Sequence, residues 1–273
     1  MLPQSLLVAI SALAITSAGP VRKRCDASSE IASTTSVAAA TSTATADDET
    51  TSPASPTLPV TGGTSELPAA NGTLIAVAVG HGIQNYTCSA AGVTATSIGA
   101  LAVLYDITDI YSSLSADEQT QLPVNVLRTT DLPLNLAETT DPSNPYAADT
   151  ADPFPADDAD LTVEGVDGPL SVLGRHYFDA ALTPTFDLYN ADGGDGLLFK
   201  GGKLSGVKAP ASADPGLLNT GAVDWLQLGD KGASIGLTEV YRVVTAGGGP
   251  LTCDEAGQVF SVPYASQYWF YDS

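Results

Sequence analysis

The sequence has few basic residues, few histidines and no long hydrophobic run after its first residues. Its 10 Lys and Arg residues are outnumbered by 31 Asp and Glu residues, which gives a formal net charge of −21. Nucleic acids and anionic membrane surfaces are bound by clustered basic side chains, so this composition argues against both partners. No later apolar stretch is long enough for a transmembrane helix. We interpret the excess of negative charge as a feature that promotes solubility.

Histidine occurs only at His81 and His176. This scarcity excludes most metal sites that use histidine ligands and most catalytic nucleophiles that a histidine activates. Neither histidine has a second histidine at metal-ligand spacing, so we predict no metal site. Gly232–Gly236 has the form G-x-S-x-G, but a nucleophile elbow needs a histidine later in the chain, and both histidines come earlier. We therefore interpret this segment as a glycine-rich hairpin turn.

The N-terminal residues are typical of a secretory address. Leu6–Ile15 is apolar but too short to span a bilayer, and small residues ending at Ala18 follow it. A Lys-Arg pair ending at Arg24 matches the dibasic processing sites of many fungal secreted proteins. We expect a signal peptide over 1–18, a short pro-segment over 19–24, and a protein that is secreted to the extracellular space or the cell wall.

Residues 25–65 consist mainly of Ala, Ser, Thr and Pro with a few acids. Such a segment cannot bury enough apolar surface to offset the entropy of ordering, so we expect a disordered stalk, and its composition favours O-glycosylation. A single β domain is predicted over 66–273. Two sequons, at Asn71 and Asn85, predict N-glycosylation on its surface.

The three cysteines fit an oxidising compartment. Cys88 and Cys253 lie near the two ends of the predicted domain, and we expect them to form a disulfide. Cys25 is the odd residue, and it is either a free thiol, an intermolecular bridge or removed by processing.

Gly174–Leu188 has the clearest local pattern. In the first strand of this segment, the alternation places His176 and Phe178 on one face and Tyr177 on the other. Thr-Pro then marks the start of a second strand, and the whole pattern is typical of a half-buried hairpin. Many short strands and Gly/Pro turns favour an all-β fold, an antiparallel sandwich or barrel-like domain with one or two short helices. Further expected elements are a turn at 80–82, a helix capped at 115 and stopped by a proline at 123, a turn over 190–202, and separate strands over 259–264 and 267–271.

Together these motifs resemble a family of secreted fungal and bacterial proteins defined as a domain of unknown function. The resemblance covers about Leu67–Tyr271 and implies an all-β extracellular domain without a catalytic assignment. Some members carry an inherited malate dehydrogenase label. The segments that carry the resemblance are Gly82–Cys88, Gly174–Asp179, Pro184–Phe186, Val240–Gly248 and Val262–Tyr271.

The dehydrogenase label can be tested on the residues themselves. Gly80-His81-Gly82 could form the turn after a first Rossmann strand, but Asn85 occupies the third glycine position. The fingerprint also needs a helix that starts at this turn, whereas a sequon and the bridged Cys88 follow it. We therefore predict no nicotinamide cofactor and no other cofactor.

The remaining candidates are aromatic and polar residues of the predicted strands. They either fill the core or line a groove for a sugar or another small ligand. Arg242 stands between apolar strand residues, so we expect it to pair with a carboxylate. The ligand-binding candidates are His176, Tyr177, Trp225, Arg242 and Tyr268.

We expect a monomeric, non-catalytic secreted domain that binds a cell-wall polysaccharide or a small extracellular ligand. The alternative is a secreted hydrolase that acts through carboxylates or His176. A solvent-facing His176 within reach of Asp179 or Asp187 would favour the hydrolase, and a buried one would count against it.

Overall fold

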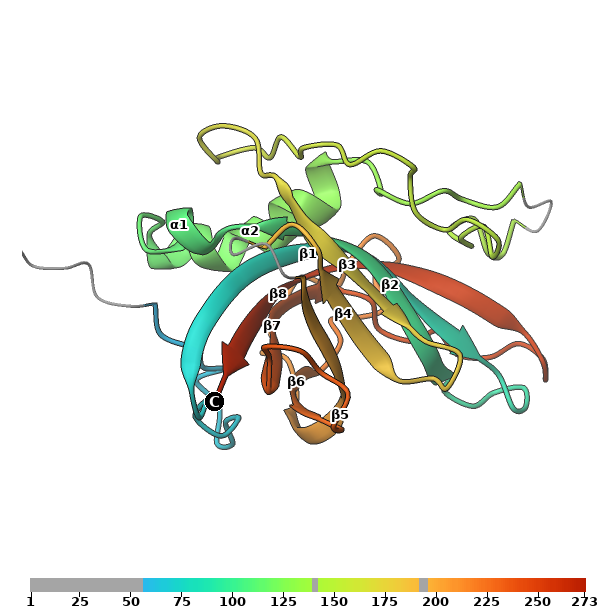
Figure 1. Ribbon diagram of the computed structural model, residues 1–273. Coiled ribbons are helices and arrows are strands. Elements are labelled where there is room, and N and C mark those ends of the chain that lie inside the picture. Colours follow the sequence, from blue (N-terminus) through green and yellow to red (C-terminus); the bar gives the residue numbers. More distant parts are fainter. Residues whose placement is uncertain (1–55, 139–141, 192–195) are drawn as a thin grey trace, which may run out of the picture. The chain divides into compact units, whose positions relative to one another are not determined.

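The computed structural model describes residues 56–138, 142–191 and 196–273. In this part of the chain, eight antiparallel strands close into a barrel in which each strand pairs with the next and β8 returns to β1 (Figure 1). This confirms the predicted all-β antiparallel fold, in its barrel form. The elements are β1 (Thr73–Thr87), β2 (Thr96–Asp106), α1 (Thr108–Tyr111), α2 (Ala116–Thr129), β3 (Val172–Phe178), β4 (Pro184–Leu188), β5 (Leu197–Val207), β6 (Trp225–Asp230), β7 (Glu239–Gly247) and β8 (Val259–Asp272).

The predicted hairpin is present as β3 and β4. His176 pairs with Phe186 across the hairpin, and both side chains are buried. Tyr177, the next residue along β3, is only half-buried because its side chain points to the other face of the sheet. The period-2 alternation in this stretch therefore gave the correct faces.

The turn predicted at Gly80–Gly82 is wrong, because these residues lie inside the continuous strand β1. A Cβ at Gly80 would lie 2.6 Å from a ring carbon of Tyr268, and one at Gly82 would lie 1.8 Å from the Leu101 carbonyl oxygen. The glycines are therefore needed for close approach, by a ring at Gly80 and by a neighbouring strand at Gly82, and not for a turn.

Two further predictions fail at the boundaries of strands. The glycine-rich turn expected over 190–202 overlaps β5, in which Gly201 and Gly202 pair with Asp230 and Gly229 of β6. The two strands expected over 259–264 and 267–271 form the single strand β8. Ala265 and Ser266, which separated the two expected strands, are both buried within β8.

Helix α2 begins as predicted but does not end at Pro123. Ser115 forms a capping box with Glu118, and the helix runs through Pro123 to Thr129. Proline removes the N–H that would bond the carbonyl four residues earlier, at Gln119. That carbonyl instead accepts a hydrogen bond from Gln267 Nε2 of β8 at 2.7 Å, which replaces the lost helix bond.

The barrel wall is buried on both faces. Inside it, aromatic side chains pack together, among them Phe186, Phe199 and Phe270. Outside it, α2 packs on β1, β7 and β8, with Leu122 and Val126 in the same cluster as Trp269. Within the described part of the chain, no helix combines the length and apolarity that a membrane span needs.

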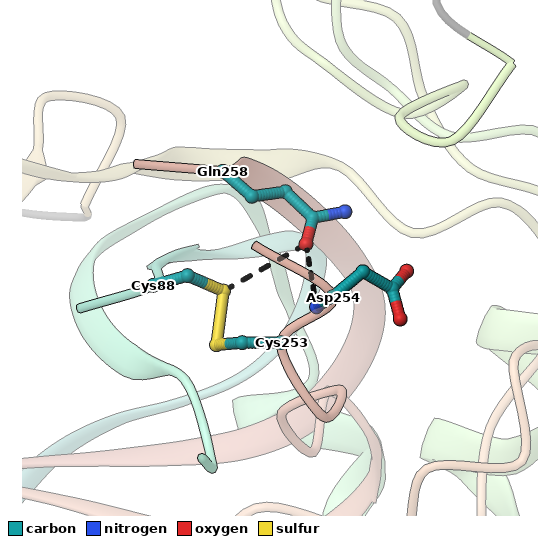
Figure 2. Close-up of a disulfide and its surroundings, with 4 residues drawn as sticks. All are labelled: Cys88, Cys253, Asp254 and Gln258. Atoms are coloured by element: carbon teal, nitrogen blue, oxygen red, sulfur yellow. Dashed lines mark hydrogen bonds between the residues drawn. A yellow bond between two sulfur atoms is a disulfide. The ribbon is translucent and has the colours of Figure 1, made fainter. Parts of the chain in front are cut away.

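The disulfide between Cys88 and Cys253 is confirmed. It joins the residue after β1 to the loop between β7 and β8, with the two Cα atoms 5.6 Å apart. Figure 2 shows that the same loop is held by Gln258, whose Oε1 accepts a hydrogen bond from the Asp254 amide at 3.1 Å. Cys25 lies outside the described residues.

Removing this disulfide should strongly destabilise the barrel, because it closes a loop of 165 residues. In a Cys25→Ser background, the double variant Cys88→Ala/Cys253→Ala should lose up to about 5 kcal/mol of unfolding free energy on the chain-entropy account. Urea unfolding followed by tryptophan fluorescence measures this loss. Dithiothreitol should destabilise the parent similarly and leave the double variant unchanged. Equal stability of parent and variant would contradict the prediction.

Candidate functional site

The interior of the barrel is incompletely filled and contains a cavity of about 590 Å³, here called the lumen cavity. All eight strands contribute to its lining. Apolar surface comes from inward-facing side chains that include Ala100, Phe186, Leu228 and Tyr268. The principal polar lining residues on the strands are Gln84, His176, Lys203 and Arg242.

The cavity lies toward one end of the barrel. At the other end, where β1 begins and β8 finishes, the interior is filled by the fully buried Leu188, Phe199 and Phe270. At the cavity end, Ser97 and Lys203 line the cavity and are solvent-exposed, so they form its rim. The lumen cavity is therefore a cup with a filled base.

His176 lies deep in this cup, with 3% of its surface exposed. Its ring stacks on Phe186 with centroids 4.0 Å apart, and Nδ1 lies 2.9 Å from the Thr185 carbonyl oxygen. A carbonyl can only accept, so Nδ1 carries the proton. Burial, assisted by the nearby charge of Arg242, lowers the pKa of His176 to about 3. The imidazole is neutral at ordinary pH.

Arg242 does not pair with a carboxylate, so that expectation is wrong. Its Nε and Nη2 donate to the backbone carbonyl of Asp224 at 3.3 and 2.9 Å. No carboxylate of the described residues lies within ion-pair distance of its guanidinium. A backbone carbonyl carries only a partial charge, so the positive charge of Arg242 stays largely uncompensated at the cavity wall.

The five predicted ligand-binding residues divide between the two faces of the barrel. His176, Arg242 and Tyr268 line the lumen cavity together. Tyr177 lines a groove on the outer face, and Trp225 lines a smaller cavity of about 240 Å³ beside α2. Side chains alternate across a strand, so residues with the opposite phase cannot reach the lumen.

The outer groove is the larger space, about 770 Å³, and several of its polar groups are already bonded within the protein. Arg175 stacks over Phe154 and Tyr189 and donates to the Pro155 carbonyl at 2.9 Å. Asn144 Oδ1 accepts from the Ser261 amide at 2.9 Å. These contacts attach the long segment after α2 to the barrel, so we interpret the groove as part of the packing interface between that segment and the barrel.

The lumen cavity differs from the outer groove because buried polar atoms without hydrogen-bond partners line it. Gln84 Nε2 and Thr220 Oγ1 both line it, and neither makes a hydrogen bond of ordinary geometry in the described part of the chain. The Gln84 amide acts only weakly on the nearby Tyr264 hydroxyl, whose pKa it lowers against the larger effect of burial. Gln84 is only 4% exposed. Leaving such a group unsatisfied costs about 1–3 kcal/mol, so these atoms are suited to bonding a ligand. A glutamine in an apolar strand was the available sequence signal, and sequence reasoning missed it.

The rim of the cup is held by the loop after β7. Tyr86 Oη donates to the Gly248 carbonyl at 2.5 Å, and Gly249 and Pro250 line the cavity. Gly248 has φ +83°, and a Cβ there would lie 2.8 Å from Cβ of Tyr264. The disulfide at Cys253 fixes the same loop three residues further on. The rim is thus rigidly positioned over the cavity.

The G-x-S-x-G segment and the Gly80–Gly82 segment form no catalytic or cofactor site. Ser234 lies in the loop between β6 and β7, as predicted, and donates to Asp230 Oδ1 at 2.6 Å rather than to a histidine. Gly80–Gly82 forms no phosphate-binding turn, since strand and not helix follows it. No cluster of metal-ligating side chains occurs among the described residues.

The predicted modification sites fall in different places. Asn71 is exposed before β1, and its backbone N–H donates to Glu239 Oε2 at 3.1 Å. Asn85 is half-buried in β1 and accepts from Ser261 Oγ at 2.7 Å, beside the outer groove. Processing sites Ala18 and Arg24 lie outside the described residues.

The buried histidines should make stability depend on pH. Burial lowers the pKa of His81 to about 4 and is the main cause that lowers the pKa of His176 to about 3, against about 6.5 unfolded. The unfolded chain therefore binds more protons between these values, so stability is complete above pH 6.5 and falls as the pH drops toward 4. Between pH 7 and pH 5, each histidine should cost about 2 kcal/mol.

Urea unfolding of the parent and of His176→Gln at both pH values measures this contribution, and the variant should lose about 2 kcal/mol less on acidification. His81→Gln should behave in the same way. Imidazole proton resonances that titrate near pH 6.5 in the folded protein would contradict the prediction.

Comparison with known proteins identifies the family and nothing beyond it. Residues 68–272 match the family described as "Protein of unknown function (DUF3455)", so the match includes the strands that form the lumen cavity. No curated protein and no solved structure matches the chain. The matched region makes up most of the 273 residues. This chain therefore belongs to the DUF3455 family of proteins of unknown function.

Proposed function

We propose that the protein is a secreted, non-catalytic module that binds a small extracellular ligand in the lumen cavity. The observation that carries the proposal is the presence of partnerless donors, Gln84 Nε2 and Thr220 Oγ1, at the wall of a preformed cavity. Ligand sites typically combine a mostly apolar wall with a few convergent polar groups, in a volume of about 300–1,000 Å³. The lumen cavity has this composition and a volume of about 590 Å³.

The shape of the cavity favours a small ligand over a polysaccharide chain. A polymer needs an open-ended groove, whereas the base of the cup is filled by Phe199 and Phe270. The outer groove could follow a sugar chain, but Arg175, Asn144 and Ser261 within it are already bonded inside the protein. We therefore place the ligand inside the barrel.

The surroundings of His176 support binding over hydrolysis. A general base needs a pKa near the working pH and access to the proton it removes. His176 is buried, and its pKa lies at about 3. Asp187 lines the outer groove, and Asp179 forms an ion pair with Lys200 at 3.2 Å, so neither carboxylate serves His176.

The proposed location outside the cell follows from the N-terminal sequence and agrees with the disulfide. Disulfides form and persist in oxidising compartments. The bridge at Cys88 and Cys253 also restrains the loop at the rim. A secreted monomer with a stalk and a rigid cup would present the cavity to small molecules outside the cell.

A neutral apolar fluorophore tests the proposal. N-phenyl-1-naphthylamine emits strongly only in an apolar environment, so the protein should raise its emission saturably, with one site per chain. Ser97 and Ile98 form a matched pair, because these adjacent exposed residues of β2 line the lumen cavity and the outer groove respectively. Ser97→Trp should obstruct the cup and weaken binding by about tenfold or more, whereas Ile98→Trp should not.

Circular dichroism and urea unfolding would establish that both variants keep the parent fold. Absence of saturable emission with the folded parent would overturn ligand binding in the lumen. Loss of emission in Ile98→Trp but not in Ser97→Trp would place the site in the outer groove instead.

A further inference from the structure

The lumen cavity has a charge opposite to that of the whole chain. Its lining holds three cations, Lys203, Lys208 and Arg242, and one carboxylate, Asp224. The full chain has only 10 basic residues against 31 acidic ones. In the outer groove, by contrast, Asp149 and Asp187 outnumber Arg175. Positive charge is therefore concentrated where the proposed ligand would lie.

Two of these cations have no anionic partner in the part of the chain that the structure describes. Lys208 Nζ lies 3.0 Å from Asp224 Oδ1, which uses the cavity's carboxylate. Arg242 donates only from Nε and Nη2, both to the Asp224 carbonyl, so Nη1 remains available. Lys203 makes no side-chain hydrogen bond or ion pair within the described ranges.

The strand register places these two cations on the same side of the barrel. Arg242 of β7 pairs with Leu226 of β6, which pairs with Gly206 of β5. A Cβ on Gly206 would lie 3.0 Å from Lys203 Nζ, so the ammonium group lies beside that same row of residues. Lys203 at the rim and Arg242 on the wall can thus face one ligand group.

The remainder of the cup offers apolar contact. Phe178 and Leu226 are half-buried and present apolar surface to the cavity, and Phe186 and Tyr268, with ring centroids 5.1 Å apart, are buried in its wall. A purely inorganic anion would leave this surface uncovered, and a neutral hydrocarbon would leave the donors unpaired. Charged donors and apolar walls together favour a molecule that has both an anionic and an apolar part.

We propose that the ligand is an amphipathic organic anion, whose carboxylate or comparable oxyanion is bound by Arg242 and Lys203 while its apolar body packs on Phe178 and Leu226. This proposal rests on the proposed function, since it assumes that a ligand occupies the lumen cavity. Gln84 Nε2 supplies a further donor to the same ligand. The overall charge of −21 repels anions at long range, so binding depends on this local cluster.

Two probes that differ only in the head group test it. Decanoate and decan-1-ol have the same apolar chain, and each would displace N-phenyl-1-naphthylamine from the full-length protein at pH 7. Decanoate should bind at least about tenfold more tightly than decan-1-ol, because its carboxylate accepts charge-assisted hydrogen bonds. Added sodium chloride should weaken decanoate binding and leave decan-1-ol binding unchanged. Sodium sulfate, an anion without an apolar body, should displace the fluorophore poorly.

Charge variants locate the effect. Lys203→Gln removes an exposed cation of the rim, and Lys231→Gln is the matched control, because Lys231 is a nearby lysine that does not line the cavity. The affinity ratio of decanoate to decan-1-ol should fall severalfold in Lys203→Gln and stay at the parent value in Lys231→Gln. Arg242→Gln should reduce the ratio further, and Arg242→Lys should restore part of it.

The outcomes separate the two proposals. If the fluorophore binds in the cup but decan-1-ol displaces it as well as decanoate does, the ligand site stands and the anionic ligand is refuted. Displacement by sulfate at the concentration needed for decanoate would refute the amphipathic part. If the fluorophore does not bind the folded parent, the proposed function itself fails. If Arg242→Gln does not fold, the comparison of Lys203→Gln with Lys231→Gln still decides the question.

Discussion

The pairing of β1 with β8 is the interaction on which the rest of the structure depends. It joins the first and last strands over nearly their whole lengths, from Thr73 opposite Asp272 to Thr87 opposite Val259. Closure satisfies the backbone groups of both edges and divides every strand into an inward and an outward face. An open sheet would have one apolar side to cover. The closed one has an interior that side chains must fill and an exterior that α2 and the long segment after it cover.

Burial on both faces explains which strands the sequence revealed. In β3, half-buried Arg175 and Tyr177 alternate with buried residues, so the period of two was visible and both faces were assigned correctly. In β8, nearly every residue is buried, so no alternation marks its course, and Ala265 and Ser266 were mistaken for a break. Glycines were misread for a related reason. Their need is set by long-range neighbours, such as the Tyr268 ring beside Gly80, which lies far away in sequence.

The site was accessible from sequence only where the phase of a strand could be fixed. His176, Arg242 and Tyr268 were chosen for their chemistry and proved to share the lumen, whereas Tyr177 and Trp225 have the outward phase. Lys203 was missed because the first part of β5 was taken for a turn that ends at residue 202, and no strand was predicted directly after it, so Lys203 was assigned to no sheet face. The carboxylate expected beside Arg242 was a reasonable inference from burial, but its actual partner is a backbone carbonyl, which no sequence pattern specifies.

That carbonyl partner bears on what the lumen is for. An arginine placed among apolar barrel residues loses part of its hydration, and one carbonyl acceptor returns only a fraction of it. A leucine or methionine would fill the same space without that cost. The cavity that Arg242 borders is also lined by the unsatisfied amide of Gln84, and its rim is fixed by a disulfide. If the interior served only as a packed core, apolar residues at these positions would make the protein more stable. A ligand that bonds these polar groups would instead offset the cost of their desolvation. The polar lining of the cup therefore supports recognition of a ligand over structural stability as its purpose.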